Sequence, residues 1–473
     1  MLTTNSEYEL LKESLKKESF HTLKRRILNG DFLDPLEYKA VLDNTKDARM
    51  AWWREARFGF FIHFGLYSLT KRGEWTLARD GISPKEYEKL AEQFMPNQNA
   101  AEEWVLTAKA AGAKYVVLTT RHHDGFSLWN STVNPFNSCN YGCKRDIVAE
   151  FVAACRKHNM KIGFYSSLMD WHHPDAARMA FDIKARARFL QYLEELNIEL
   201  LTNYGKIDIL WYDMAYPNES SDGWNTLQRD QKLRSLQPDI IINDRGRLFS
   251  DFTTREEAVQ SCDDDWESCL TFNTLSWGYI DEEQAQNYAY TPHALIKKLS
   301  YICRNKGNLL LNIGPRPDGT IAQHEKYTLE KMGKWLNKYK NVIYNNNQRS
   351  ANGLIGLNCY GEYGSDMLSE PTAIGNTVYI WNFIWPKEGT YRIAGYKTIP
   401  QRIYYADTGE EIKFCYDKEN CCIILQDLPA SSIDKILGIT IIAIEFAEKP
   451  RFKFCINYPH VNDGHLENSG LLH

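Results

Sequence analysis

The chain has 473 residues, a formal net charge of −5 and a globular composition in which 25% of the residues are charged. This length exceeds the usual size of one domain, so we expect two or more domains with a sizeable core. The slight acidic excess, without any long run of Lys and Arg, excludes an electrostatic footprint for nucleic acid. The 13 Trp and 27 Tyr exceed the needs of a core, and rings with a polar tip suit a sugar ligand.

The eleven Cys are an odd number without a disulfide-like spacing, which favours a reducing compartment. Cys139 and Cys143 lack a second pair or a His at zinc spacing, so we interpret them as structural. The N-terminal region has no apolar run typical of a signal peptide, and no stretch approaches ~18 continuous apolar residues. We therefore expect no membrane association and a cytoplasmic protein, or a secreted or periplasmic one if a signal has been removed.

In chain order, the first expected element is an amphipathic helix over residues 1–30. Ser6 and Glu9 form a capping-box pattern, and Gly30 can end the helix. The apolar positions that recur at helical spacing are Tyr8, Leu11, Leu15, Leu23 and Ile27. We interpret residues 1–48 as an N-terminal helical extension whose apolar face docks on the rest of the chain, rather than on a membrane.

Residues 49–345 alternate between apolar strands and helical stretches. Helices are expected over Ala101–Ala111, closed by Gly112, and over Ile147–His158, opened by Asp146. This alternation predicts a (β/α)8-like barrel, with closure inferred because six strands are recognisable. The six strands are Phe58–Phe64, Lys114–Thr119, Lys161–Ser166, Ile207–Asp213, Asp239–Asn243 and Asn308–Ile313.

The pattern changes after Asn345 to short β-type runs separated by turns. We predict a C-terminal all-β sandwich domain over residues 346–450 and a polar tail over 451–473. The expected strands are Thr377–Trp385, Tyr391–Tyr396, Arg402–Ala406, Glu411–Tyr416, Cys422–Leu425 and Gly438–Phe446.

Polar and aromatic residues gather at the ends of the predicted barrel strands, the rim at which barrels place their chemistry. Asp213, at the end of the apolar run of Ile207–Asp213, would by itself be equally well explained as a turn cap. Similar side chains at five successive strand ends favour a functional site. They are Phe61 and His63, then Glu74 and Trp75; Arg121, His122, His123 and Asp124; Tyr165; Trp211 and Asp213; and Asn243, Asp244 and Arg245.

Two chemistries could use these residues. Paired carboxylates with hydroxyl-binding His, Arg and Trp are typical of a glycoside hydrolase. Clustered His and Asp could instead hold a divalent metal, but the adjacent His122 and His123 point to opposite faces of a strand and no His-x-His pair accompanies them. The pattern favours the hydrolase without a metal.

The barrel region resembles the α-L-fucosidases of glycoside hydrolase family 29. The similarity covers essentially all of residues 50–345, in the order of the family. The motifs that carry it are FGFFIHFGLYS (58–68), GEW (73–75), GAKYVVLTTRHHDGFSLWNS (112–131), KRDIV (144–148), GKIDILWYDM (205–214), QPDIIINDRG (237–246), SWGY (276–279) and KGNLLLNIGPRPDGTI (306–321).

The resemblance implies an exo-acting, retaining α-L-fucosidase that needs no cofactor or metal and acts on fucosylated glycans or oligosaccharides. Asp213 matches the family's nucleophile, which forms a covalent fucosyl-enzyme. An apolar wall would receive the methyl group of fucose and leave a galactose hydroxyl unpaired. The matching sugar-binding and wall residues are Phe61, His63, Glu74, Trp75, His122, His123, Tyr165, Trp211, Arg245 and Trp277.

The general acid/base lies on a variable segment of the family, and Glu256, Glu257 and Glu267 are candidates. DFTTRE (251–256) is similar to the segment that carries this residue in one branch, which selects Glu256, while Trp266-Glu267 also matches a family motif. The residues after Asp213 resemble the branch that accepts aryl fucosides and several linkages. A catalytically inactive fucose-binding protein on the same barrel, or a metal-dependent barrel hydrolase, are the alternative functions.

Overall fold

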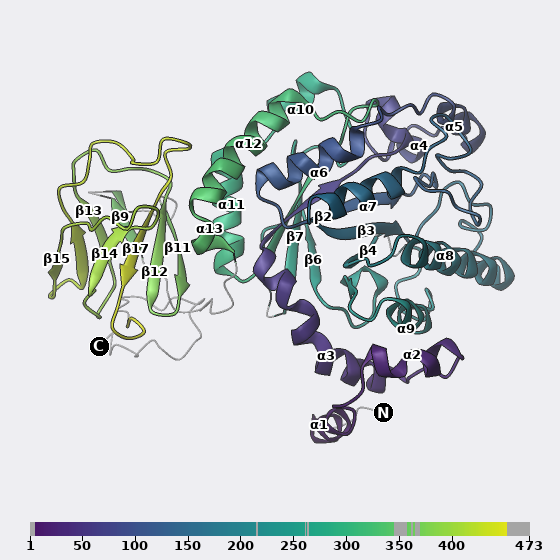
Figure 1. Cartoon of the computed structure of the whole chain (residues 1–473), viewed down its shortest axis with the longest axis horizontal. Coiled ribbons are helices and arrows are strands. Elements are labelled where there is room, and N and C mark those ends of the chain that lie inside the picture. The colour runs from purple at the N-terminus through teal and green to yellow at the C-terminus, as the bar shows by residue number, and fades with distance from the viewer. Residues whose placement is uncertain are drawn as a thin grey trace.

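The computed structural model describes residues 5–213, 216–260, 262, 264–344, 357–360, 363–364 and 369–451. Two bodies of structure follow each other along the chain: a barrel with its helices, and a smaller β-domain (Figure 1). Most of the expected C-terminal tail lies outside the described residues.

The barrel is one eight-stranded sheet with the order β5-β4-β3-β2-β1-β8-β7-β6, in which all neighbouring strands are parallel. Seven of the eight strands contain runs of buried side chains on both faces, as expected for strands covered by helices. Their bounds are β1 Phe58–Ile62, β2 Tyr115–Arg121, β3 Lys161–Ser167, β4 Ile209–Asp213, β5 Ile241–Ile242, β6 Thr253–Glu256, β7 Trp266–Thr271 and β8 Asn308–Ile313.

The six predicted strands are present, and β6 and β7 are the two that the sequence analysis did not recognise. Within the described residues, only the short 3₁₀ helix Asp244–Gly246 lies between β5 and β6 and no helix lies between β6 and β7, so the alternation on which the prediction rested stops there. The edge strands β5 and β6 meet through a parallel bridge between Asn243 and Phe252, and Asp251 N donates to Ile242 O at 2.9 Å. This contact closes the barrel.

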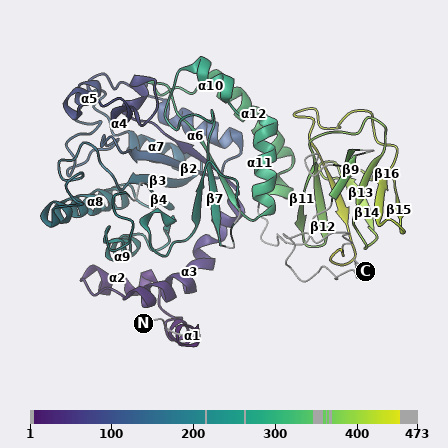
Figure 2. The ribbon, with the colours of Figure 1, turned by 180° about the vertical axis from the view of Figure 1, so that it is seen from behind.

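Helices cover the outside of the sheet (Figures 1 and 2). The helix ends predicted at Asp146 and Gly112 are confirmed. The Asp146 side chain accepts from Ala149 N at the start of α7, and Gly112 ends α6 with a φ of 96°. The helices of this region are α4 Thr76–Arg79, α5 Pro84–Ala91, α6 Ala100–Ala111, α7 Ile147–Lys157, α8 Ile183–Asn203, α9 Thr226–Leu236, α10 Glu282–Tyr288, α11 Pro292–Arg304, α12 Gln323–Lys338 and α13 Lys340–Ile343.

The N-terminal region differs from the single helix predicted over residues 1–30, and that prediction is wrong. It forms α1 (Asn5–Ser14) and α2 (Phe20–Leu28), followed by α3 (Pro35–Ala56). The break is local, because the Ser19 side chain accepts from Thr22 N and begins a new helix. The α3 helix runs across the expected boundary at residue 48 into the barrel region. As expected, the apolar face is docked: α2 packs beside α9 beneath the barrel (Figure 2).

A buried ion-pair cluster ties α3 to the closing edge of the barrel. Asp251 accepts from Arg49 Nη2 at 2.7 Å and from Arg234 Nη2 at 2.8 Å, and these three side chains are almost completely buried. The carboxylate also accepts from Ile242 N at 2.8 Å. Burial alone would raise the pKa of Asp251, but the two guanidinium groups lower it below its ordinary value.

Replacing Asp251 by Asn is expected to reduce the free energy of unfolding by about 3–5 kcal/mol, because two buried guanidinium groups lose their counter-charge. In the parent chain the pKa of Asp251 is lower in the folded state, so this stabilisation is complete above about pH 4 and is lost as the pH falls through the folded value. Urea denaturation at several pH values measures both effects. Asp47→Asn is the control: its side chain is 92% exposed, so loss of the Arg54 pair should cost less than about 1 kcal/mol.

The C-terminal domain packs two antiparallel sheets face to face, as the predicted sandwich requires. One sheet has the order β10-β9-β13-β16-β15 and the other β11-β12-β17-β14. The strands are β9 Leu357–Tyr360, β10 Tyr363–Gly364, β11 Ser369–Ile374, β12 Thr377–Asn382, β13 Tyr391–Ala394, β14 Arg402–Tyr405, β15 Phe414–Asp417, β16 Cys422–Leu425 and β17 Thr440–Glu445.

Alternation along the central strands explains how this domain attaches to the barrel helices. Ile380 and Ile442 join the core of the sandwich, whereas Trp381 and Ile441 point to the opposite face and join the core of the barrel region. Trp335 of α12 packs on Trp381 and donates from Nε1 to Ile439 O at 2.8 Å. Within the described residues, no helix is long and apolar enough to cross a membrane.

Candidate active site

A cavity of about 130 Å³ opens at the rim formed by the carboxyl ends of the barrel strands. The catalytic, sugar-binding and wall residues implied by the family resemblance line it, with the exception of Glu74, whereas the strand-end residues Arg121, Asp124, Asn243 and Asp244 do not. The lining consists of Phe61, His63, Trp75, His122, His123, Tyr165, Trp211, Asp213, Arg245, Glu256 and Trp277. The cavity thus combines an aromatic wall with two carboxylates, a guanidinium and three imidazoles.

Asp213 is the last residue of β4, and both of its carboxylate oxygens accept hydrogen bonds. Tyr165 Oη donates to Oδ2 at 2.9 Å, and Arg245 Nη1 donates to Oδ1 at 3.0 Å. His123 Nε2 lies 3.5 Å from Oδ2. The two hydrogen bonds from Tyr165 and Arg245 hold the carboxylate in one orientation at the edge of the cavity, as an attacking group requires.

Arg245 connects Asp213 with Glu256, the last residue of β6. Its Nη2 donates to Glu256 Oε2 at 2.7 Å, while its Nε donates to Thr254 Oγ1 at 2.9 Å. Burial by itself would lower the pKa of Arg245, but the two neighbouring carboxylates raise it above its ordinary value. One guanidinium therefore brings the two carboxylates of a potential catalytic pair together in the cavity.

Glu267 lies below the floor of the cavity. Its position in β7 is paired with Thr254, two residues before Glu256, so it lies one layer deeper in the barrel. Its carboxyl group accepts from Trp211 Nε1 at 3.0 Å and from the hydroxyl of Tyr115. Complete burial raises the pKa of Glu267 to about 7. Its hydrogen bond positions Trp211, and Glu267 itself does not line the cavity.

Glu257 is also turned away from the cavity. Its backbone has a φ of 49°, and its Oε1 accepts from Thr271 N at 2.6 Å at the end of β7. Burial raises the pKa of this carboxyl group above its ordinary value. Of the three acid/base candidates, Glu256 alone lines the cavity, and its side chain is 46% exposed.

The three imidazoles are almost completely buried at one side of the cavity. Burial lowers the pKa of His63 and of His123 to about 3, and it lowers that of His122 well below its ordinary value. The ring of His122 stacks on Tyr165 with an angle of 3° between the planes. All three imidazoles are therefore neutral near pH 7 and can exchange hydrogen bonds with sugar hydroxyls.

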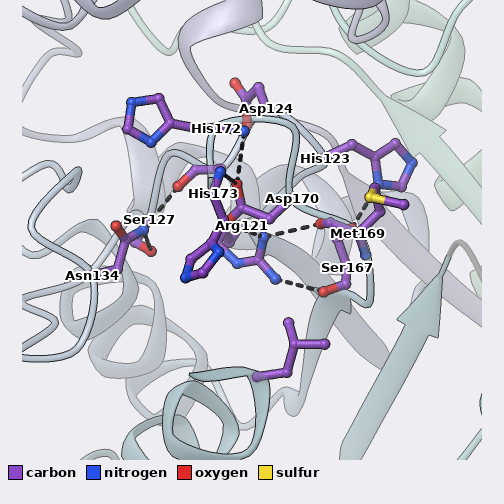
Figure 3. Close-up of polar contacts among 12 residues, drawn as sticks. Arg121, His123, Asp124, Ser127, Asn134, Ser167, Met169, Asp170, His172 and His173 are labelled. Atoms are coloured by element: carbon purple, nitrogen blue, oxygen red, sulfur yellow. Dashed lines mark hydrogen bonds and ion pairs between the residues drawn. The ribbon is translucent and has the colours of Figure 1, made fainter. Parts of the chain in front are cut away.

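A polar network behind His123 supports this side of the cavity (Figure 3). Arg121 donates from Nη2 to Ser167 O and from Nη1 to Met169 O and Asp170 Oδ2. Asp170 also accepts from the backbone N of His172 with its Oδ1, which fixes the loop after β3. Arg121 thus supports the cavity from outside and does not line it.

The apolar part of the cavity is a cluster of aromatic rings. The ring of Phe61 lies 5.2 Å from that of Trp211 and 6.0 Å from that of Trp277 between centroids. Tyr165 stacks on Trp211 at 5.8 Å. Trp75, which is 40% exposed, packs on Trp171 at the entrance. This wall suits the apolar face and methyl group of a deoxy sugar.

Glu74 does not line the cavity. Its Oε2 accepts from Ser276 Oγ at 2.8 Å and from Gly278 N at 2.7 Å. These two bonds fix the loop that carries Trp277, so Glu74 acts on the cavity wall through its neighbour.

His122, His123 and Asp213 also bring three possible metal-ligand atoms within 4.8 Å of one another. The site is a poor fit for a cation, because both oxygens of Asp213 already accept hydrogen bonds and one donor is the positively charged Arg245. A cation bound to this carboxylate would lie close to the positive charge of that guanidinium.

Two supporting residues were not recognised in the sequence. Asn312 lies in the apolar run of β8 and contacts His63, and Ser167 ends β3 and contacts His123. A polar residue inside an otherwise apolar barrel strand was the signal for Asn312. Ser167 carried no distinguishing signal.

Comparison with known proteins agrees with this geometry. The profile of the family described as Alpha-L-fucosidase matches residues 32–341. The chain is 33% identical to the human plasma alpha-L-fucosidase over 349 residues, which are 65% of this chain and 73% of that protein. It is 29% identical to the human tissue alpha-L-fucosidase over 426 residues, covering 83% and 88% of the two chains.

Solved structures show the same arrangement of a barrel followed by a β-domain. Alpha-L-fucosidase isoenzyme 1 from Paenibacillus thiaminolyticus superposes with a TM-score of 0.75 at 28% identity, covering 85% of this chain and all of that one. A family 29 alpha-L-fucosidase from Bacteroides thetaiotaomicron, trapped as a covalent intermediate, gives a TM-score of 0.72 at 27% identity, covering 84% and 96%. The chain therefore belongs to the α-L-fucosidases of glycoside hydrolase family 29, a family of retaining enzymes.

Proposed function

We propose that this protein is an exo-acting α-L-fucosidase that removes terminal α-L-fucose from glycans or oligosaccharides. The single observation that carries the proposal is Arg245, which holds Asp213 and Glu256 together in a cavity with a neutral, hydroxyl-binding side and an aromatic side. Both carboxylates of a retaining mechanism are thus available to one sugar ring.

In the proposed mechanism, Asp213 attacks the anomeric carbon as the glycosidic bond breaks. Glu256 donates a proton to the leaving oxygen, for which it exchanges its contact with Arg245 for one with the glycan. The same carboxylate then takes a proton from a water molecule whose oxygen attacks the anomeric carbon, and the bond to Asp213 breaks to release fucose. Tyr165 and Arg245 keep the attacking carboxylate in place throughout.

Release of L-fucose from an aryl α-L-fucoside in the presence of EDTA is the direct test. Because the cavity residues supply attack, proton transfer and sugar binding, we expect full turnover at saturating chelator. An enzyme assay with and without EDTA, followed by addition of Zn²⁺ or Mg²⁺, measures this. Binding of fucose without turnover would support the inactive binding protein, and loss of turnover with EDTA would support the metal-dependent hydrolase.

For the substrate range, we expect activity on an aryl fucoside and on more than one natural linkage. The sequence after Asp213 favours this, and the exposed Trp75 beside Trp171 offers a stacking surface that does not require one particular aglycone. Rates on 2'-fucosyllactose, on Lewis trisaccharides and on the aryl fucoside measure the range. Activity confined to the Lewis trisaccharides would contradict the prediction.

A further inference from the structure

We propose that Asn312 and Ser167 fix the tautomers of His63 and His123, so that each imidazole presents an unprotonated Nε2 to the cavity as an acceptor for a substrate hydroxyl. The inference rests on the proposed function only for the identity of the ligand. Asn312 and Ser167 are positioning residues in this view, since they act through the imidazoles.

The tautomer of His63 follows from the orientation of the Asn312 amide. Asn312 Nδ2 donates to Trp277 O at 2.7 Å, so its carbonyl oxygen Oδ1 faces His63. This oxygen lies 2.6 Å from His63 Nδ1 and can only accept, which places the proton of the neutral ring on Nδ1. Nε2 is then the nitrogen with a free lone pair, on a side chain that lines the cavity.

The tautomer of His123 follows from the single proton of Ser167. Ser167 Oγ lies 2.6 Å from Met169 O, accepts from Met169 N at 3.0 Å, and lies 2.7 Å from His123 Nδ1. Two oxygens at 2.6 Å need a proton between them, so the hydroxyl donates to Met169 O and accepts from His123 Nδ1. The position of Ser167 in this network is visible in Figure 3.

The opposite tautomer of His123 would place a proton on Nε2, facing Asp213. The distance from Nε2 to Asp213 Oδ2 is 3.5 Å, which is long for a charge-assisted hydrogen bond. That tautomer would also leave Ser167 Oγ and Met169 O in contact without a proton. The contact to Ser167 at 2.7 Å therefore decides the tautomer, and Nε2 faces the cavity beside the carboxylate as a second acceptor.

The consequence is that His63, His123 and Arg245 each have a fixed hydrogen-bonding direction in the cavity, as donor or as acceptor. Nε2 of His63 and of His123 accepts hydrogen bonds from sugar hydroxyls and cannot donate to them, while Arg245 is a donor only. A ligand with hydroxyl donors at two positions satisfies both imidazole acceptors. An analogue that lacks one of these hydroxyls leaves a buried acceptor unpaired.

The first experiment reads the tautomers directly and needs no substrate. The protein labelled with ¹⁵N-histidine is studied by long-range ¹H–¹⁵N correlation NMR near pH 7, with assignment from His63→Gln and His123→Gln. We expect a protonated Nδ1 and an unprotonated Nε2 on both rings. A protonated Nε2 on either ring overturns the proposal, whether or not the protein is a fucosidase.

The second experiment combines Ser167→Ala with 2-, 3- and 4-deoxy analogues of an aryl α-L-fucoside. In the parent enzyme, one deoxy position should reduce kcat/KM by about tenfold or more through loss of the bond to His123. In Ser167→Ala the proton on His123 Nδ1 is no longer held. The loss of kcat/KM at this deoxy position should therefore shrink by about tenfold, while the losses at the other two deoxy positions stay unchanged. The His123 NMR signals should show mixed tautomers.

Ser235→Ala is the matched control, because its buried hydroxyl donates to a backbone oxygen within α9, Gln231 O, and contacts no imidazole. It should leave all deoxy penalties and His signals unchanged. Unchanged penalties and signals in Ser167→Ala would contradict the proposal. If the parent enzyme releases no fucose, the proposed function fails, and the NMR measurement still decides the tautomers.

Discussion

Replacing Asp213 by Gly is expected to reduce turnover of every α-L-fucoside by about 10⁴-fold or more, the scale of loss when a covalent nucleophile is removed. The carboxylate lies at the end of β4, where Tyr165 and Arg245 orient it towards the cavity. The shortened side chain leaves space on the face opposite the leaving group. Added azide should therefore restore part of the activity by attacking that face directly, giving the β-fucosyl azide.

The measurement is release of the aryl group with and without azide, with the product anomer identified by NMR. Asp239→Gly is the control, because that carboxylate is 58% exposed and pairs with His21 and Lys206, away from the cavity residues. It should retain the parent rate. Activity of Asp213→Gly without azide, at a level near that of the parent, would show that the assignment of the whole cavity is wrong.

Replacing Glu256 by Ala is expected to lower the rate by an amount that depends on the leaving group of the substrate. Natural fucosides, whose leaving oxygen needs a proton, should lose about 10²–10⁴-fold in rate, whereas activated aryl fucosides should lose far less in the first step. The covalent intermediate still forms on Asp213, so azide should give the α-fucosyl azide by two successive inversions. Pre-steady-state kinetics on an aryl series, with analysis of the azide product, measures this.

Glu257→Ala and Glu267→Ala are the matched comparisons. Glu257 bonds to the backbone of Thr271, so its removal should affect stability and leave the dependence on the leaving group unchanged. Glu267 holds Trp211 from below, so its removal should lower the rate on all fucosides by a similar factor. If Glu256→Ala keeps the full rate on natural fucosides while either comparison variant becomes sensitive to the leaving group, the acid/base belongs to that variant.

Local pattern was sufficient for much of the fold. Runs such as Asn308–Ile313, buried on both faces, and the signals at Asp146 and Gly112 depend on neighbours in the chain, and the structure contains these elements as predicted. The prediction of a single N-terminal helix was wrong because it relied on helical spacing alone. That spacing continues across the break, but the Ser19 side chain caps a new helix there and ends the continuity.

The closing strands β6 and β7 could not be recognised from pattern. Thr253–Glu256 is short and polar, and within the described residues no α-helix separates it from its neighbours. It is identified as a strand by its pairing with β7 and by the bridge from Phe252 to Asn243. These are contacts between strands, which the propensity of a single segment does not encode.

The chemical types in the cavity were determined by the sequence by itself. Aromatic, imidazole and carboxylate side chains at successive strand ends, together with the family motifs, indicate a fucosidase from the sequence alone. The parallel strands of a barrel end at one rim, so residues far apart in the chain, such as His63 and Asp213, were expected to meet there.

Only the tertiary structure decided which carboxylate faces the cavity. Glu256 and Glu267 are both in strands, but the register of β6 and β7 places the first at the rim and the second one layer below, against Trp211. It also decided that Glu74 lies behind the wall, and that Asn312 and Ser167 orient His63 and His123. The physical reason is that residue type and spacing specify only the face of a strand on which a side chain lies. The depth of that side chain in the barrel, its hydrogen-bond partner and the position of its proton depend on side chains from other strands.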